Sequence, residues 1–149
     1  MQELNGEMAT DDAPRILRLD CGGCGGCRLE TARSVLALSD ADRLRVLASS
    51  TTDQVDVLLI TGALLRCDAL RLRHLYQRTG REPIVVAVGA CSLSGGVFAG
   101  AYGVAGGASE VIPVDVFVPG CPPRGDLVLD GLLESLRALR VRPPFKISA

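Results

Sequence analysis

The sequence is poor in aromatic residues, in histidine and in net charge. Its 149 residues include three Phe, two Tyr, no Trp and one His, and 16 basic residues nearly balance 17 acidic ones. Proteins that bind nucleic acid usually carry a basic patch or aromatic side chains on which bases stack, so we expect no nucleic-acid partner. The single His74 has no serine and acid arranged around it as a triad, which argues against a hydrolase.

Long apolar runs are also missing from the sequence. No stretch reaches the roughly 18 to 20 residues that a membrane-spanning helix needs. The polar and acidic start, MQELNGEMATDDAP, lacks the basic-plus-apolar layout of a signal peptide. We therefore expect a cytoplasmic protein. In a reducing compartment, six cysteines indicate metal or redox chemistry rather than a set of disulfides.

Apolar segments typical of strands alternate along the chain with segments typical of helices. The length and the hydrophobic fraction of 48% suffice for one domain with a full core. We expect strands at 15–20, 43–49, 55–62, 83–91 and 114–120, and helices at 28–38, 63–78 and 126–140. This alternation predicts a parallel sheet with right-handed crossovers. The prediction is a single α/β domain at 14–149, a flavodoxin-like doubly wound and mostly parallel sheet, after a flexible leader at 1–13.

Five of the six cysteines follow predicted strands. Cys21, Cys24 and Cys27 come after the first strand, Cys91 ends the fourth, and Cys121 follows the last. The carboxyl ends of parallel strands meet at one edge of such a sheet, where ligands bind. The topology therefore brings these thiols together, at the carboxyl ends of the strands.

Several soft thiolates in one place select zinc or an iron–sulfur cluster. Structural zinc sites usually pair two short C-x₂-C motifs, whereas here one such motif is joined by two isolated cysteines. This arrangement favours a cluster, and a structural zinc site in a non-redox scaffold remains the alternative. Glycines around the thiols permit the close backbone approach that a cluster needs. The sixth cysteine, Cys67, is expected to be a small buried hydrophobe.

Three motifs carry a resemblance to a known family. They are CGGCRLE at 24–30, GACSLSGGVF at 89–98 and IPVDVFVPGCPPR at 112–124. In this order and spacing they resemble the small subunit of energy-converting [NiFe] hydrogenases, which is homologous to the 20-kDa-type iron–sulfur subunit of respiratory complex I. The resemblance covers the chain from Arg15 onward.

The resemblance implies a cofactor, partners and an activity. The cofactor would be one [4Fe–4S] cluster held by Cys24, Cys27, Cys91 and Cys121. The partners would be a [NiFe]-hydrogenase-type or complex I-type large subunit, a further iron–sulfur subunit, and membrane subunits reached only through these. The expected function is an electron relay within an oxidoreductase complex, on the cytoplasmic side, with no substrate chemistry by this chain alone.

The first motif separates two branches of the family. It reads C-x-x-C instead of the adjacent cysteine pair of complex I subunits, which favours the hydrogenase branch. A complex I-like quinone or ferredoxin oxidoreductase without nickel stays the alternative.

Two residues near the first motif have roles that stay open. The pair C-x-x-C also fits Cys21 with Cys24. We place it at Cys24 and Cys27, because Glu30 then falls where the family has its acidic residue, and Cys21 becomes a bystander or an alternate ligand. Glu30 is expected in the first turn of a helix. It either stabilises the helix dipole by about 0.3–1 kcal/mol or, by resemblance, serves proton transfer near the cluster.

Overall fold

The structure is a computed structural model that describes residues 13–40, 45–47, 54–79 and 82–141. For Asp40 and residues 45–47 it describes the backbone only. The predicted leader at 1–13 lies outside this set except for Ala13, which is buried.

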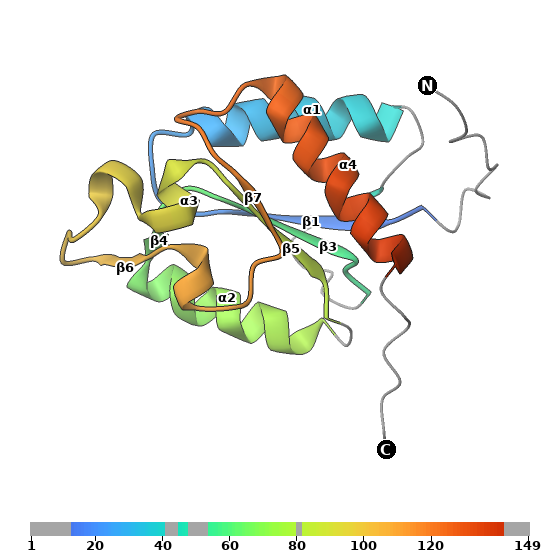
Figure 1. Ribbon diagram of the computed structural model, residues 1–149. Coiled ribbons are helices and arrows are strands. Elements are labelled where there is room, and N and C mark those ends of the chain that lie inside the picture. Colours follow the sequence, from blue (N-terminus) through green and yellow to red (C-terminus); the bar gives the residue numbers. More distant parts are fainter. Residues whose placement is uncertain (1–12, 41–44, 48–53, 80–81, 142–149) are drawn as a thin grey trace, which may run out of the picture.

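A five-stranded parallel sheet forms the centre of the domain (Figure 1). Its strands are β1 (Arg15–Asp20), β2 (Arg45–Leu47), β3 (Val57–Thr61), β5 (Ile84–Val88) and β7 (Val116–Val118). They lie in the order β2-β1-β3-β5-β7, and every neighbouring pair is parallel. Counted among the sheet strands alone, this is the 2-1-3-4-5 order of flavodoxin-like folds. The predicted fold class is confirmed.

Helices cover both faces of the sheet (Figure 1). They are α1 (Gly26–Asp40), α2 (Arg66–Arg78), the short α3 (Ala90–Ser94) and α4 (Gly125–Val141), with single 3₁₀ turns at Gly96–Phe98 and Ala108–Glu110. Along β3, Leu59 packs on the side of α1 and α4, whereas Leu58 packs on the side of α2. Because both faces are buried, such strands are continuous apolar runs, which explains why they are evident in the sequence.

One expected helix boundary is wrong. The helix predicted from Ala63 begins only at Arg66, after a two-residue strand, β4 (Leu64–Leu65). This strand pairs antiparallel with β6 (Val104–Gly106), in the glycine-rich stretch. Ala63 also forms an isolated bridge with Gly22, next to the first cysteines. Leu65, in this strand, is 37% exposed. A strand this short has no periodicity that a sequence could reveal.

The carboxyl ends of β1, β3, β5 and β7 lie at one edge of the sheet (Figure 1). The loops that follow β1, β5 and β7 leave from this edge and lead to α1, α3 and α4. These are the loops that contain the cysteines expected to gather there.

Candidate metal centre

Three loops supply the cysteines of the candidate site. Cys24 lies between β1 and α1, and Cys27 is the second residue of α1. Cys91 lies in the first turn of α3, since β5 already ends at Val88. Cys121 follows β7 and precedes a cis peptide bond to Pro122. We call Cys24, Cys27, Cys91 and Cys121 the four-cysteine group.

Backbone hydrogen bonds join the second and third loops. The Gly89 N–H donates to the Val118 carbonyl, and the Ala90 N–H donates to the Gly120 carbonyl, both at 2.8 Å. Since Ala90 and Gly120 directly precede Cys91 and Cys121, these two bonds fix the two cysteine segments side by side.

The first loop lies against the third. A Cβ placed on Gly26 would lie 3.6 Å from Cys24 Sγ and 3.6 Å from carbons of the Pro122 ring. Gly26, within the first motif, thus lies next to Pro122, the residue that follows Cys121. All three cysteine-bearing loops are therefore neighbours at this edge of the sheet, as the strand order predicts.

Two glycines pack directly against the thiols. Gly89 has φ +89°, and a Cβ there would lie 2.3 Å from Cys27 Sγ. Gly96 has φ +55°, and its Cβ would lie 3.0 Å from Cys91 Sγ. Side chains are therefore excluded at both positions by sterics and by backbone conformation. Backbone approaches the sulfur atoms closely, as expected of the surroundings of a thiolate-ligated centre.

The thiols of the four-cysteine group interact electrostatically. Burial raises the pKa of Cys27, and the neighbouring thiols of Cys91, Cys121 and Cys24 raise it further. Burial likewise raises the pKa of Cys91, followed by the effects of Cys121 and Cys24. Both shifts have the cause expected where ionised thiols crowd together in a poorly solvated place. A bound metal centre would reverse them, because its positive charge favours the thiolate.

Cys21 belongs to different surroundings. Its pKa is raised to about 12, first by burial and then by the carboxylates of Asp68 and Asp20; Arg71 lowers it and Cys67 raises it. Its side chain packs against the apolar cluster on the α2 side of the sheet. Among the charged neighbours that shift the Cys21 pKa, no member of the four-cysteine group occurs.

A pocket of about 260 Å³ opens at this edge of the sheet, lined by residues 20–28 together with Thr61, Gly62 and Cys91. Cys21 is therefore part of its wall, and Cys121 is not. Within the described ranges, no three His, Cys, Asp or Glu side chains are grouped so as to hold a single metal ion. The donors of the four-cysteine group are soft thiols only, which suit zinc or an iron–sulfur cluster and not a hard cation. The donor chemistry therefore fits the expected cofactor.

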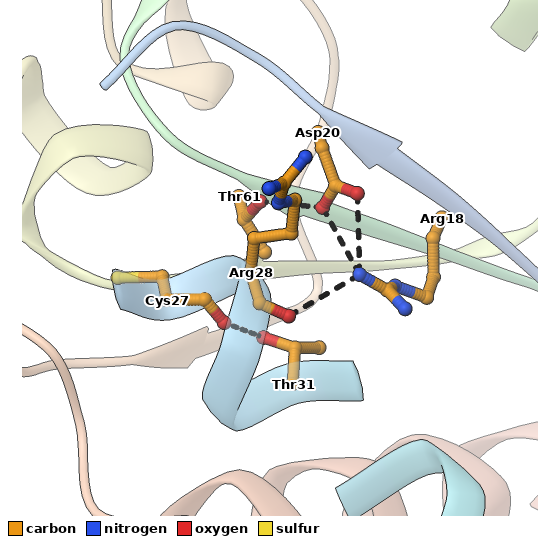
Figure 2. Close-up of polar contacts among 6 residues, drawn as sticks. All are labelled: Arg18, Asp20, Cys27, Arg28, Thr31 and Thr61. Atoms are coloured by element: carbon orange, nitrogen blue, oxygen red, sulfur yellow. Dashed lines mark hydrogen bonds and ion pairs between the residues drawn. The ribbon is translucent and has the colours of Figure 1, made fainter. Parts of the chain in front are cut away.

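A polar network joins β1 and β3 to the first turn of α1, next to the first motif (Figure 2). Arg18 Nη2 donates to the Arg28 carbonyl at 3.3 Å and forms an ion pair with Asp20 Oδ2 at 3.1 Å. The Thr61 hydroxyl donates to Asp20 Oδ1 at 2.8 Å. This network was not predicted, although charged residues in the otherwise apolar strand RILRLD were a usable signal.

Glu30 differs in one respect from expectation. Because α1 begins at Gly26, Glu30 lies beyond its first turn, which contains no acidic residue. Its carboxylate instead neighbours Gly125, the first residue of α4, where an added Cβ would lie 3.4 Å from Glu30 Oε2. A carboxylate is favourable near a helix N-terminus, so the helix partner is α4. Proton transfer by Glu30 stays a prediction.

The two remaining candidates lie on α2. His74 is exposed, as expected of a solvated residue. Cys67 is also exposed, so its expected role as a buried hydrophobe is wrong. Cys67 precedes the buried Leu72 of α2 by five residues, and at 3.6 residues per turn this places it away from the buried side of the helix.

Comparison with known proteins identifies the family. The family model described as NADH ubiquinone oxidoreductase, 20 Kd subunit, matches residues 21–135. The chain belongs to this family. The recognition made from the three motifs is thereby confirmed, as is the expectation of a subunit of an oxidoreductase complex.

Similar proteins carry hydrogenase names. Formate hydrogenlyase subunit 7 of Escherichia coli is 37% identical over 83% of this chain, which spans 49% of that protein. The probable membrane-bound hydrogenase subunit mbhJ of Pyrococcus furiosus is 35% identical over 85% of this chain and 76% of its own length. A chain of the NAD⁺-reducing [NiFe]-hydrogenase structure shares the fold, with a TM-score of 0.67 at 23% identity over 91% of this chain and 96% of that one. In the described part of this chain, no helix has the length and hydropathy to cross a membrane.

Proposed function

We propose that this chain is an electron-relay subunit that holds one [4Fe–4S] cluster on Cys24, Cys27, Cys91 and Cys121. The observation that carries the proposal is the contact of three cysteine-bearing loops at one edge of the sheet. A redox role agrees with the oxidoreductase family and with the hydrogenase names of the relatives. When bound, the cluster would supply one-electron transfer.

The chain's own residues would hold the centre and shield it. Cys27 and Cys91 are partly buried and have raised pKa values, so each keeps its proton in the chain alone and would release it on ligating the centre. The tight packing of Gly89 against Cys27 Sγ fixes one ligand and brings backbone close to the centre. Such close backbone and burial are the means by which proteins tune cluster potentials.

The partners would be a [NiFe]-hydrogenase-type large subunit and a further iron–sulfur subunit. Apolar side chains of the segment that follows Cys91 in the chain are exposed: Val97 is 82% exposed, Tyr102 89% and Phe98 39%. Exposed apolar residues gathered near a functional site are typical of a surface that a partner covers. Attachment to the cytoplasmic face of a membrane would then occur through partner subunits.

A second candidate is the equivalent subunit of a complex I-like oxidoreductase without nickel. The family description supports it directly, since it names an NADH ubiquinone oxidoreductase subunit. The first motif, C-x-x-C at Cys24 and Cys27, favours the hydrogenase candidate. Nickel analysis of the co-purified large subunit separates the two candidates.

The test is the metal and sulfide content of the complex purified without oxygen. Iron and acid-labile sulfide near four each per chain, with an S = 1/2 EPR signal after dithionite reduction, are the expected result for a [4Fe–4S] centre. Stoichiometric zinc without sulfide, in protein made with ample iron, would refute the redox function and leave a zinc-bound scaffold.

A further inference from the structure

Two charged residues of β1, Arg18 and Asp20, lie beside the cysteine pocket. The residues of a strand alternate between its faces, so they follow Ile16 on the side covered by α1 and α4. Their side chains are only 21% and 32% exposed. Removing two charges from water is costly unless close pairing offsets the cost. A charged pair in this place therefore calls for an explanation beyond general stability.

The pair connects three elements at the cysteine edge (Figure 2). Arg18 Nη2 lies 3.1 and 3.4 Å from the two carboxylate oxygens of Asp20. The same nitrogen donates to the carbonyl of Arg28, which directly follows Cys27 in α1. Asp20 also accepts the hydroxyl of Thr61 at the end of β3. The pair thus anchors the helical turn of one proposed ligand to the ends of two strands.

The hydrogen bonds of Arg18 involve one of its nitrogens and not another. Its Nη2 atom makes the hydrogen bonds given above, whereas its Nε is buried and has no hydrogen-bond partner among the described residues. An unsatisfied buried donor costs free energy. Arg18 is therefore kept here despite an unsatisfied Nε. Its guanidinium contacts Asp20 and the helical turn that contains Cys27.

The pair has a direction relative to the pocket. Asp20 is part of the pocket wall, together with Cys21, Cys24 and Cys27, whereas Arg18 does not line the pocket. The negative member of the pair is therefore the one on the pocket wall. Charges held in a partly buried place act on one another more strongly than charges in water.

We infer that Arg18 and Asp20 are positioning residues that set the reduction potential of the centre proposed on the four-cysteine group. The inference rests on the proposed function, and it deepens that function. A centre with four thiolate ligands gains one negative charge on reduction, so the Asp20 carboxylate opposes reduction and the Arg18 guanidinium favours it. Removing either charge should shift the potential, and the two shifts should have opposite signs.

The experiment is an EPR-monitored redox titration of the complex purified with its partners. At the wild-type midpoint, Asp20→Asn should raise the ratio of reduced to oxidised cluster about three- to tenfold. Arg18→Met should lower that ratio by a smaller factor, because Arg18 lies behind Asp20. In the double variant the ratio should return close to the wild-type value. Arg18→Lys keeps a positive charge, so its ratio should also lie close to that of the wild type.

An exposed ion pair serves as the matched control. Arg137 and Glu134 form a pair on α4 at 3.4 Å, with both side chains exposed. Arg137→Met and Glu134→Gln should leave the midpoint unchanged, because solvent screens exposed charges.

Four results decide the matter. Shifts of opposite sign, absent from the control variants, support the inference. If the wild type holds its cluster, two results overturn the inference and leave the proposed function intact. The variants then shift the ratio in the same direction, or they shift it by less than twofold. A wild type without iron and sulfide overturns both. If Arg18→Met does not retain the centre, the isosteric Asp20→Asn and the control variants still decide the sign.

Discussion

Two sets of thiols lie close together at the carboxyl edge of the sheet, and their surroundings differ. Members of the four-cysteine group raise the pKa of one another, and glycine backbone packs against the sulfurs of Cys27 and Cys91. Cys21 instead packs against the core on the α2 side, with Asp68 and Asp20 as its main charged neighbours. Cys67, which also acts on Cys21, is exposed on α2.

The difference shows that nearness in sequence does not define a site. Cys21 is three residues from Cys24, whereas Cys121 is almost a hundred residues away. Cys121 nevertheless raises the pKa of Cys27 and of Cys91, whereas Cys24 is not among the groups that shift the pKa of Cys21. The bridge between Gly22 and Ala63 joins the residue after Cys21 to the segment that precedes α2. Three predictions test this division between the two sets.

The largest effect is expected from removing a ligand of the four-cysteine group. Cys27→Ser and Cys91→Ser should each lower cluster iron and sulfide to a small fraction of the wild-type content, because a hard hydroxyl replaces a soft thiolate. Iron and sulfide analysis of the anaerobically purified complex checks this. The matched control is Cys67→Ser, an exposed cysteine outside the group, which should keep the full content. Full retention in Cys27→Ser would refute the assignment.

A smaller but still large effect is expected from Gly89→Ala. Its Cβ would lie 2.3 Å from Cys27 Sγ, and φ is +89°, so the substitution displaces a proposed ligand and strains the backbone. We expect loss of most of the cluster and a destabilisation of about 1–3 kcal/mol, measured by iron content and by urea unfolding.

Gly100→Ala separates the two causes. Gly100 has φ +80°, and nothing lies within 4 Å of an added Cβ. Backbone strain should therefore be similar in both variants, whereas the contact with the ligand exists only at Gly89. Equal cluster loss in the two variants would show that strain, and not the contact with Cys27, is responsible.

The smallest effect on the cluster is expected from Cys21→Ser, which should keep the wild-type content. Its effect should appear at alkaline pH instead. The pKa of Cys21 is raised from 9.0 to about 12, so the folded protein binds this proton more tightly than the unfolded chain does. The resulting contribution to stability is complete below pH 9 and is lost as the pH rises toward 12.

Urea unfolding at pH 8, 9.5 and 11 tests this consequence. Between pH 9.5 and 11 the wild type should lose more stability than Cys21→Ser, with both proteins otherwise behaving alike. Loss of the cluster in Cys21→Ser, together with its retention in Cys27→Ser, would mean that the first motif is Cys21 with Cys24.

The sequence predicted most of the sheet and the gathering of the thiols. The strand RILRLD was predicted at Arg15–Asp20, where β1 lies. The apolar runs around β3 and β5 were evident because strands covered on both faces need no polar alternation. The parallel order then follows from alternating strands and helices, and it places the cysteine loops at one edge.

Other features could not be predicted, because they depend on contacts between distant segments. The short strand at Leu64–Leu65 depends on pairing with a segment about forty residues further on. The position of Glu30 beside Gly125 depends on how α1 packs against α4. Neither effect leaves a periodic pattern in the sequence.

The sequence by itself determined the α/β class and the residue types of the site, because hydrophobic runs and cysteine spacing are local properties of the chain. The tertiary structure was needed to show which thiols raise the pKa of one another, because Cys27, Cys91 and Cys121 come from three separate loops. It also decided that Gly89 must lack a side chain, since the obstacle is the sulfur of Cys27, more than sixty residues away. Local preference selects the elements, and packing between distant segments selects their neighbours.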